Sequence, residues 1–526
     1  MSLRLSPKLG SLSVSRSLSR GRRSSGYSSR RYITNSYSAF AYTWLTKTPE
    51  AILKSPQDIL SSLPSSPTPL LAKDSVPVLL VTPSFAHWLD PSDDFLPNLM
   101  CRLYGNDSSS TLYGVAAVID KIPTNQTPAD KPKLEGNESS VVNELESEGL
   151  SLLVVDKENV QGKAAPTRRI GGPASEDADL VVSIQGRPVA RNSVRATHEI
   201  GLRLSNTVFV NGKESTLVGM RWARDAAANA VTLHNTIDLT SCYIAPTSAA
   251  SDIKPTLTLP LYPVGERRKV IASMGNILRQ ISKSTDPTSN EPIPASSELE
   301  KDLPRYIEEH NIMDQRVSVW ALVENPSILI ANQDSSTQDR VVQSLHQGGK
   351  LHRVMSGGGG WGKKQGLLSL DPEVSFPGTT RRRELVGLDQ LFKPKADAEL
   401  DIPPFLTKSM VGDDLSLLSQ VATAGDFIQF FVSVDPAYSL HAVPKDASLA
   451  DSSITYRFGV VSRAEELSSR DTNDGEKDIT VVPNSFGALS EKAIAYAQPV
   501  AQGGATSESS TKLDIPGCRV ILSPVS

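Results

Sequence analysis

The hydrophobic positions of this chain form short runs separated by long polar stretches. Two runs are uninterrupted, Pro77–Thr82 (PVLLVT) and Leu112–Ile119 (LYGVAAVI), and a continuous apolar run of this length is typical of a strand buried on both faces. Between them, Asp93–Tyr104 carries apolar residues at helical spacing, and a third apolar run, Leu150–Asp156, follows a polar stretch. This β-α-β-loop-β order predicts an α/β fold built on a largely buried sheet.

Local signals farther along the chain predict one hairpin and two helices. The alternating runs Gly201–Val210 and Glu214–Trp222 flank Asn211-Gly212, a pair that favours the type I′ turn of a β-hairpin because both residues tolerate positive φ angles. Apolar residues at helical spacing predict a helix over Glu266–Ile281 and a shorter one over Ser490–Tyr496.

The length of 526 residues exceeds a single ordinary core and predicts more than one structural unit. We therefore predict an α/β fold with two lobes of mixed β-sheet, flanking helices and long polar loops. The expected divisions are 1–32 as a targeting segment, 33–75 as a flexible lead-in, 76–282 as a first lobe with the hairpin, 283–295 as a linker and 296–526 as a second lobe carrying a glycine-rich segment.

Composition singles out the first 32 residues, which are rich in serine, carry eight Lys or Arg residues and contain no Asp or Glu. Such a segment is typical of a mitochondrial transit peptide, whose positive charge draws it across the energised inner membrane. Arg30-Arg31-Tyr32 resembles a matrix-processing site and predicts cleavage near Tyr32. The alternative is a basic tail that binds nucleic acid. The composition favours targeting, and we expect a protein of the mitochondrial matrix.

Removal of that segment makes the remaining chain strongly acidic. It leaves 46 basic and 58 acidic residues, a net charge of −12, which disfavours general nucleic-acid binding because phosphate affinity comes mostly from basic surface. Any RNA contact would have to be local. No apolar run approaches the roughly 20 residues of a membrane-spanning helix, so we expect no membrane insertion. The three cysteines are scattered and form no disulfide or metal pattern.

The segment Lys350–Pro372 (KLHRVMSGGGGWGKKQGLLSLDP) is the strongest candidate for a functional site. Glycines have no Cβ, so a ligand can approach the main-chain N–H groups, and the neighbouring lysines supply positive charge for an anion. The alternative is a surface segment in which Trp361 packs back onto the protein. The predicted ligand-binding residues all lie in this segment: Lys350, His352, Arg353, Gly357, Gly358, Gly359, Gly360, Trp361, Gly362, Lys363 and Lys364.

Signatures of catalysis are weak in this sequence. Gly357-x4-Gly362-Lys363 matches seven positions of the phosphate-binding loop GxxxxGK[ST], but Lys364 stands where the Mg²⁺-binding hydroxyl belongs, and no strong strand is expected before the segment. The chain also lacks HExxH, G-x-S-x-G and CxxC patterns, and its seven histidines are scattered. We therefore predict no catalytic residues and no metal ligands, identify no cofactor, and favour a binding protein over an enzyme. Arg381–Arg383 is either a run of charges exposed to solvent or an extension of the positive charge around the glycine-rich segment.

The order and the residue types of the first predicted strands resemble those of a known family. The order PVLLVTPSFA, helix, LYGVAAVID, acidic loop, GLSLLVVD over Pro77–Asp156 is similar to the start of FIST-type sensory domains, which open with an α/β unit. The resemblance implies small-ligand binding rather than catalysis. The long loops and the glycine-rich stretch depart from the family, so no site residue is carried over from it.

Two functional hypotheses follow. In the first, the protein binds an anionic small molecule or a protein partner through Lys350–Lys364. In the second, it is a mitochondrial gene-expression or mitoribosome-associated factor that contacts RNA through the same segment and Arg381–Arg383. RNA binding weakens steeply as salt rises, whereas a buried anion site responds less, so salt dependence separates the two hypotheses.

Overall fold

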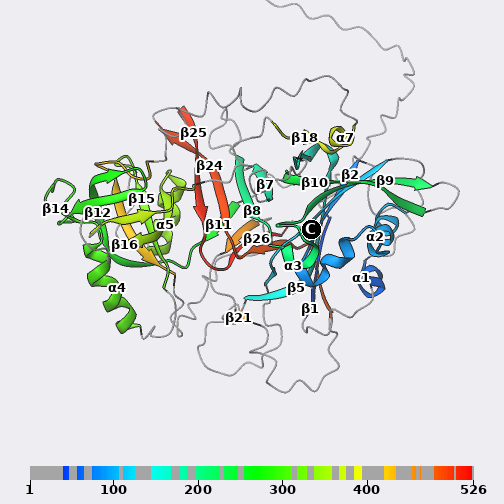
Figure 1. The fold of residues 1–526 in the computed structure, drawn as a ribbon, viewed down its shortest axis with the longest axis horizontal. Coiled ribbons are helices and arrows are strands. Elements are labelled where there is room, and N and C mark those ends of the chain that lie inside the picture. The colour runs from blue at the N-terminus through cyan, green and yellow to red at the C-terminus, as the bar shows by residue number, and fades with distance from the viewer. Residues whose placement is uncertain are drawn as a thin grey trace, which may run out of the picture. The chain divides into compact units, whose positions relative to one another are not determined.

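Figure 1 shows the fold of the chain as a computed structural model. The structure describes residues 40–46, 56–63, 74–105, 111–125, 144–166, 178–185, 197–225, 230–246, 254–310, 317–328, 337–357, 366–374, 384–393, 420–433, 453–457, 462–463, 479–502 and 505–523. Contacts join Ser38–Ser526 into one compact unit.

The largest sheet combines strands from both ends of the chain. Its main path runs through β22 (Ile479–Pro483), β1 (Phe40–Thr46), β5 (Glu144–Asp156), β2 (Ser75–Val81), β3 (Leu112–Val118), β9 (Leu217–Asp225), β10 (Ala230–Ile244), β7 (Asp179–Gln185), β8 (Thr197–Arg203), β24 (Ile494–Gln502) and β25 (Ala505–Leu513). Off this path lie β4 (Ile122–Asn125), β6 (Val160–Ala164), β18 (Val386–Gly387) and β21 (Ser462–Arg463). The sheet is mixed, because β2 pairs with β3 and β7 with β10 in parallel while most neighbours are antiparallel.

The strands β2 and β3 of this sheet are buried on both faces, as their continuous apolar runs predict. Along β2, Val78 and Leu80 belong to one apolar cluster, whereas Leu79 and Val81 belong to another. The second cluster also contains buried side chains of α1 (Pro56–Ser62), of the 3-10 helix η2 (Pro83–Leu89) and of α2 (Phe95–Tyr104). A sheet of four strands, β11 (Lys254–Thr258), β20 (Ser453–Arg457), β26 (Cys518–Ser523) and β23 (Phe486–Ser490), contributes to the first.

A third sheet closes into a six-stranded antiparallel barrel. Its strands are β12 (Tyr262–Met274), β19 (Phe427–Val432), β15 (Val319–Glu324), β16 (Lys350–Gly357), β17 (Leu368–Leu370) and β13 (Ile277–Ser282), and a pairing of β12 with β13 completes the circuit. The short strand β14 (Pro292–Pro294) extends β13. The helices α4 (Ser297–Glu309) and α5 (Thr337–His346) contact barrel strands. The fold is therefore α/β with mixed sheets and flanking helices, as predicted.

The hairpin predicted at Asn211-Gly212 is wrong. The strands on either side, β8 and β9, do not pair with each other; β8 pairs with β7 and β24, and β9 with β3 and β10. Between them, residues Val208–Asn211 form the single helical turn α3, and Gly212 ends it with φ 76°. Asn211 does not take the positive φ that a type I′ turn requires. Polar side chains favour the helical turn instead, since Thr207 Oγ1 donates to Lys213 O at 2.9 Å.

The helix predicted over Glu266–Ile281 is also wrong, because this segment is the β12–β13 hairpin around Gly275, whose φ is 59°. Val270 lies directly opposite Ile281 across the hairpin, and both belong to the cluster that fills the barrel. The apolar residues that mimic helical spacing in the sequence therefore meet across two strands.

Two further segments differ from the sequence-based expectation. The helix predicted over Ser490–Tyr496 is wrong: Ser490 ends β23, residues 491–493 connect the two strands, and Ile494 begins β24, which pairs with β8 on one side and β25 on the other. The expected linker 283–295 contains the strand β14 and the connection that joins it to its partner β13. Strands from both sides of this segment take part in the largest sheet. The division into two lobes stays a prediction.

Candidate functional site

The strand β16 carries the described part of the predicted binding segment. Lys350, His352 and Arg353 lie near its start, and Gly357 lies at its end. In an extended strand of this length, the main-chain positions of Lys350 and Gly357 are roughly 23 Å apart. The expectation that no strand precedes the glycine-rich segment is therefore wrong. The remaining predicted site residues lie outside the described part of the chain: Gly358, Gly359, Gly360, Trp361, Gly362, Lys363 and Lys364, and likewise Arg381–Arg383.

Alternation along β16 sends its side chains to two different environments. His352 lies opposite Ala321 of β15, and Ala321 belongs to the cluster inside the barrel. Leu351 lies opposite Leu322, and both belong to the cluster shared with the large sheet, outside the barrel. Because successive residues of a strand point to opposite faces, Lys350 and His352 share the inner face, whereas Arg353 lies on the outer face.

His352 is held in one tautomer by the main chain. Its Nδ1 lies 2.8 Å from the carbonyl oxygen of Asp371, and a carbonyl only accepts, so Nδ1 carries the proton and donates it. The ring is 2% exposed, and Nε2 has no hydrogen-bond partner among the described residues. The pKa of His352 is lowered to about 4, mainly by burial and in smaller part by the charge of Lys350, while the contacts with Asp371 oppose the shift. The imidazole is therefore neutral at pH 7, with an unpartnered acceptor at Nε2.

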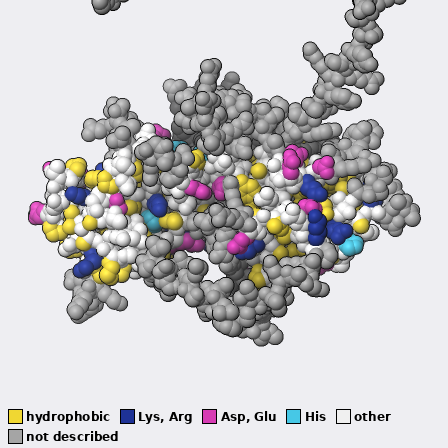
Figure 2. Space-filling view, turned by 90° about the horizontal axis from the view of Figure 1, so that it is seen from above, with side chains coloured by type: hydrophobic (Ala, Val, Ile, Leu, Met, Phe, Trp, Pro, Cys, Tyr) yellow, Lys and Arg dark blue, Asp and Glu magenta, His cyan; other side chains and the backbone are white. Residues whose placement is uncertain are grey.

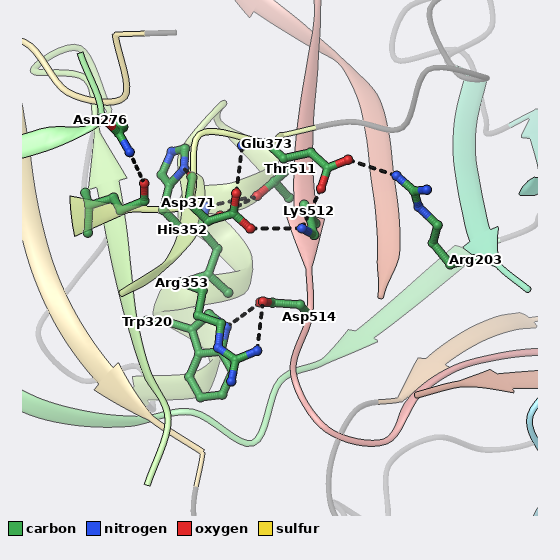
Figure 3. Close-up of polar contacts among 12 residues, drawn as sticks. Arg203, Asn276, Trp320, His352, Arg353, Asp371, Glu373, Thr511, Lys512 and Asp514 are labelled. Carbon is green, nitrogen blue, oxygen red and sulfur yellow. Dashed lines mark hydrogen bonds and ion pairs between the residues drawn. The ribbon is translucent and has the colours of Figure 1, made fainter. Parts of the chain in front are cut away.

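Arg353 is held on the outer face by Asp514, just beyond β25. Asp514 Oδ2 lies 3.6 Å from Arg353 Nη1, and Asp514 Oδ1 accepts a hydrogen bond of 2.7 Å from Trp320 Nε1. Trp320 and Arg353 are direct cross-strand neighbours on β15 and β16, so a single carboxylate fixes both side chains (Figure 3). The guanidinium group of Arg353 is thus paired with a carboxylate of the protein itself.

A second ionic group joins the end of β17 to β25. Lys512 Nζ donates to Asp371 Oδ2 at 2.9 Å and to Glu373 Oε2 at 2.6 Å, and Glu373 Oε1 accepts from Arg203 of β8 at 2.9 Å (Figure 3). Burial opposes the charge of Lys512, but the two carboxylates outweigh it, so the pKa of Lys512 is raised. Thr511 Oγ1 adds a bond of 2.9 Å from Leu351 N. These contacts fix β16 and β17 against β25.

Glycine is required at both described ends of the glycine-rich segment. Gly357 is paired with Leu368 of β17, and a Cβ on Gly357 would lie 2.2 Å from Leu368 Cδ2. Gly366, where the described chain resumes, has φ 83°, and a Cβ there would lie 2.7 Å from Pro294 Cβ. The segment is therefore anchored between two adjacent strands of the barrel.

Another buried polar group attaches α5 to the barrel. Glu324, 1% exposed, accepts from Arg267 Nε at 2.5 Å and from Arg340 Nη2 at 3.5 Å. Arg340 Nη1 also donates to Gln429 Oε1. A separate polar contact joins β8 to β24, where His198 Nδ1 lies 3.0 Å from Tyr496 Oη. These groups are satisfied mainly by the protein itself and serve to position the elements.

Sequence reasoning did not find the acidic and basic partners of β16. It gave no role to Asp371, and it did not single out Lys512, Asp514 or Arg203. Lys512 and Asp371 are 141 residues apart, so no local pattern connects them. A local signal was the placement of Lys512 and Asp514 on either side of Leu513, since such alternation is typical of a strand with one polar face.

The described surface does not favour one class of chemistry. Within the described ranges, no three His, Cys, Asp or Glu side chains form a group that could hold a metal ion. Among the same residues, no helix is both long and apolar enough to cross a membrane. On the face shown in Figure 2, the coloured basic and acidic side chains are interspersed rather than gathered by sign.

Comparison of the chain with protein-family models, with curated proteins and with solved structures finds no match.

Proposed function

We propose that this chain is a binding protein of the mitochondrial matrix, in which the glycine-rich segment 357–364 contacts an anionic small molecule or the anionic group of a protein partner. The observation that carries the proposal is the anchoring of this segment. Its first residue, Gly357, is paired with Leu368, and Gly366 takes a positive φ where the chain returns. A loop fixed at both ends on a rigid scaffold suits ligand binding, because little ordering of its ends remains when the ligand arrives.

The composition of the segment supports an anionic ligand. Four glycines in succession offer main-chain N–H groups, and Lys363 and Lys364 supply two positive charges. The resemblance of residues 77–156 to FIST-type sensory domains, which we retain as a proposal, supports the same class of function because it implies small-ligand binding. The basic, acid-free first 32 residues support the mitochondrial location.

Tryptophan fluorescence of the full-length protein, titrated with inorganic phosphate, tests this proposal. The described tryptophans Trp44, Trp88, Trp222 and Trp320 are at most 2% exposed, so a ligand at the segment changes mainly the emission of Trp361. We expect a saturable change that Gly358→Val and the double change of Lys363 and Lys364 to Ala both weaken. Trp361→Phe should remove the fluorescence change, and this variant is the control that the change comes from Trp361.

Melting curves and pull-downs from mitochondria complete the test. If the segment serves binding rather than packing, both the glycine and the lysine variants should keep the melting temperature of the wild type, because they remove no contact of the folded core. If both variants retain every partner and the phosphate response, the segment is packing or linker. A partner that disappears on RNase treatment, with binding that falls steeply as salt rises, would favour the gene-expression alternative instead.

A further inference from the structure

The predicted binding residues separate into two groups at opposite ends of β16. Gly357 lies at the end that leads into the glycine-rich segment, whereas Lys350 and His352 lie at the start. Lys350 is opposite Val323 and His352 is opposite Ala321, and both partners belong to the cluster inside the barrel. The start of β16 therefore places a cation and an imidazole on one face, about 6.6 Å apart along the strand.

The imidazole of His352 presents an acceptor that the protein does not use. Because Nδ1–H is donated to Asp371 O, the lone pair of Nε2 is the available group, and no described residue donates to it. Asp371 is itself held by Lys512 at 2.9 Å, so the carbonyl that selects this tautomer is fixed in position. A buried acceptor without a donor costs stability, and a ligand that supplies an O–H or N–H group removes that cost.

Lys350 supplies the complementary charge. It is only partly buried, and its side chain makes no hydrogen bond or ion pair to another described residue. Its ammonium nevertheless acts on the ring, because its charge contributes to the lowered pKa of His352. A lysine stem has several rotatable bonds, and the proposal below requires that movement of this side chain admit a ligand to Nε2.

We propose that Lys350 and His352 form a second site, separate from the glycine-rich segment, for a small organic anion that also carries a hydroxyl group. Lys350 binds the carboxylate or phosphate of this ligand, and His352 Nε2 accepts the hydroxyl proton in a hydrogen bond. The site does not rest on the function proposed for the glycine-rich segment, since it uses neither the loop glycines nor Lys363 and Lys364.

Glycolate and acetate are the probes for this site, because they carry the same charge and differ by one hydroxyl group. Saturation-transfer NMR titrations of the full-length protein give a dissociation constant for each. We expect glycolate to bind about fivefold more tightly than acetate, the factor that corresponds to one neutral hydrogen bond of about 1 kcal/mol. Lys350→Met should abolish binding of both acids, whereas Lys301→Met, the same change at an exposed position of α4, should leave it unchanged.

Changes at His352 separate recognition from stability. His352→Phe should retain acetate binding and lose the preference for glycolate, and His352→Gln, which keeps an acceptor, should restore part of it. Equal affinity of the wild type for the two acids, no binding of either, or a preference that survives in His352→Phe would each overturn the proposal. Gly358→Val should bind glycolate as the wild type does, so failure at one site leaves the other to be judged by its own test.

Discussion

Asp514 accepts a hydrogen bond of 2.7 Å from the indole nitrogen of Trp320, a residue 194 positions earlier in the chain. Trp320 is fully buried, and Asp514 is 9% exposed. The same carboxylate faces Arg353. This contact secures the outer face of the barrel to the end of β25, and it does so with an ionised acceptor, which strengthens the bond.

Replacing Asp514 should therefore destabilise the fold. Asp514→Ala leaves the buried Trp320 N–H without an acceptor, and we expect the free energy of unfolding to fall by roughly 1–3 kcal/mol in denaturant titrations. Asp389→Ala is the matched control, because Asp389 pairs with Lys393 at an exposed position, where such a pair contributes little. If the two changes lowered the free energy of unfolding equally, the contact of Asp514 with Trp320 would not be a main contributor to stability.

The stability of the protein should decrease in mild acid because of His352. Its pKa is lowered from 6.5 to about 4 in the folded protein, so between these values the unfolded chain binds a proton that the folded chain does not. The stabilisation is complete above pH 6.5 and is lost as the pH falls toward 4, by roughly 3 kcal/mol at most. Burial lowers the pKa of His198 to about 4 as well, and it acts in the same direction.

Melting curves between pH 8 and pH 4 test this dependence. His352→Phe removes the titrating group, so its melting temperature should fall less over this range than that of the wild type. His198 still titrates in this variant, and some decrease remains. Parallel curves for the two proteins would show that His352 does not carry the effect.

Gly212 offers a test of the revised turn. It has φ 76° as the residue that ends α3, and a Cβ built on it meets nothing within 4 Å. Gly212→Val should therefore cost only the backbone strain of a left-handed conformation, roughly 1–2 kcal/mol, and Gly212→Asn should cost less because asparagine tolerates this region. Thermal or denaturant unfolding of the two variants measures the difference. A larger loss for asparagine than for valine would contradict the assignment of strain.

Residues 1–32 should suffice to carry a fluorescent reporter into mitochondria. The physical reason is their positive charge without any acidic residue, and the mature protein should begin within a few residues of Ile33. Fluorescence imaging and N-terminal sequencing provide the two measurements. A cytosolic reporter, or a protein that retains Met1, would rule out the targeting function.

The strands predicted correctly from the sequence are those in which nearly every residue is buried. β2 and β3 are buried on both faces, so their apolar runs are unbroken and easily assigned. The β12–β13 hairpin was assigned to a helix because Val270 and Ile281 fit both a helical spacing and a cross-strand pair. Only tertiary closure of the barrel decides between these alternatives.

For the candidate site, the sequence predicted neither the strand that carries its described residues nor the partners of those residues. The position of His352 was identified from the sequence, but its environment depends on Asp371 and on the register with Ala321. Arg353 looked like a free cation until the fold brought Asp514 beside it. Pairings between residues more than a hundred positions apart leave no local pattern, so such contacts were not available from one sequence.

The pairing of β1 with β22 has a consequence for the order in which the protein assembles. Thr43 lies opposite Val482, and its hydroxyl donates to Ser485 O, 442 positions away. One edge of β1 thus acquires its neighbour only after nearly the whole polypeptide has been made. Closing so large a loop is slow, and an unpaired strand edge is prone to aggregate while it waits. Truncation at residue 478 removes β22 and should therefore leave this edge of β1 without its partner.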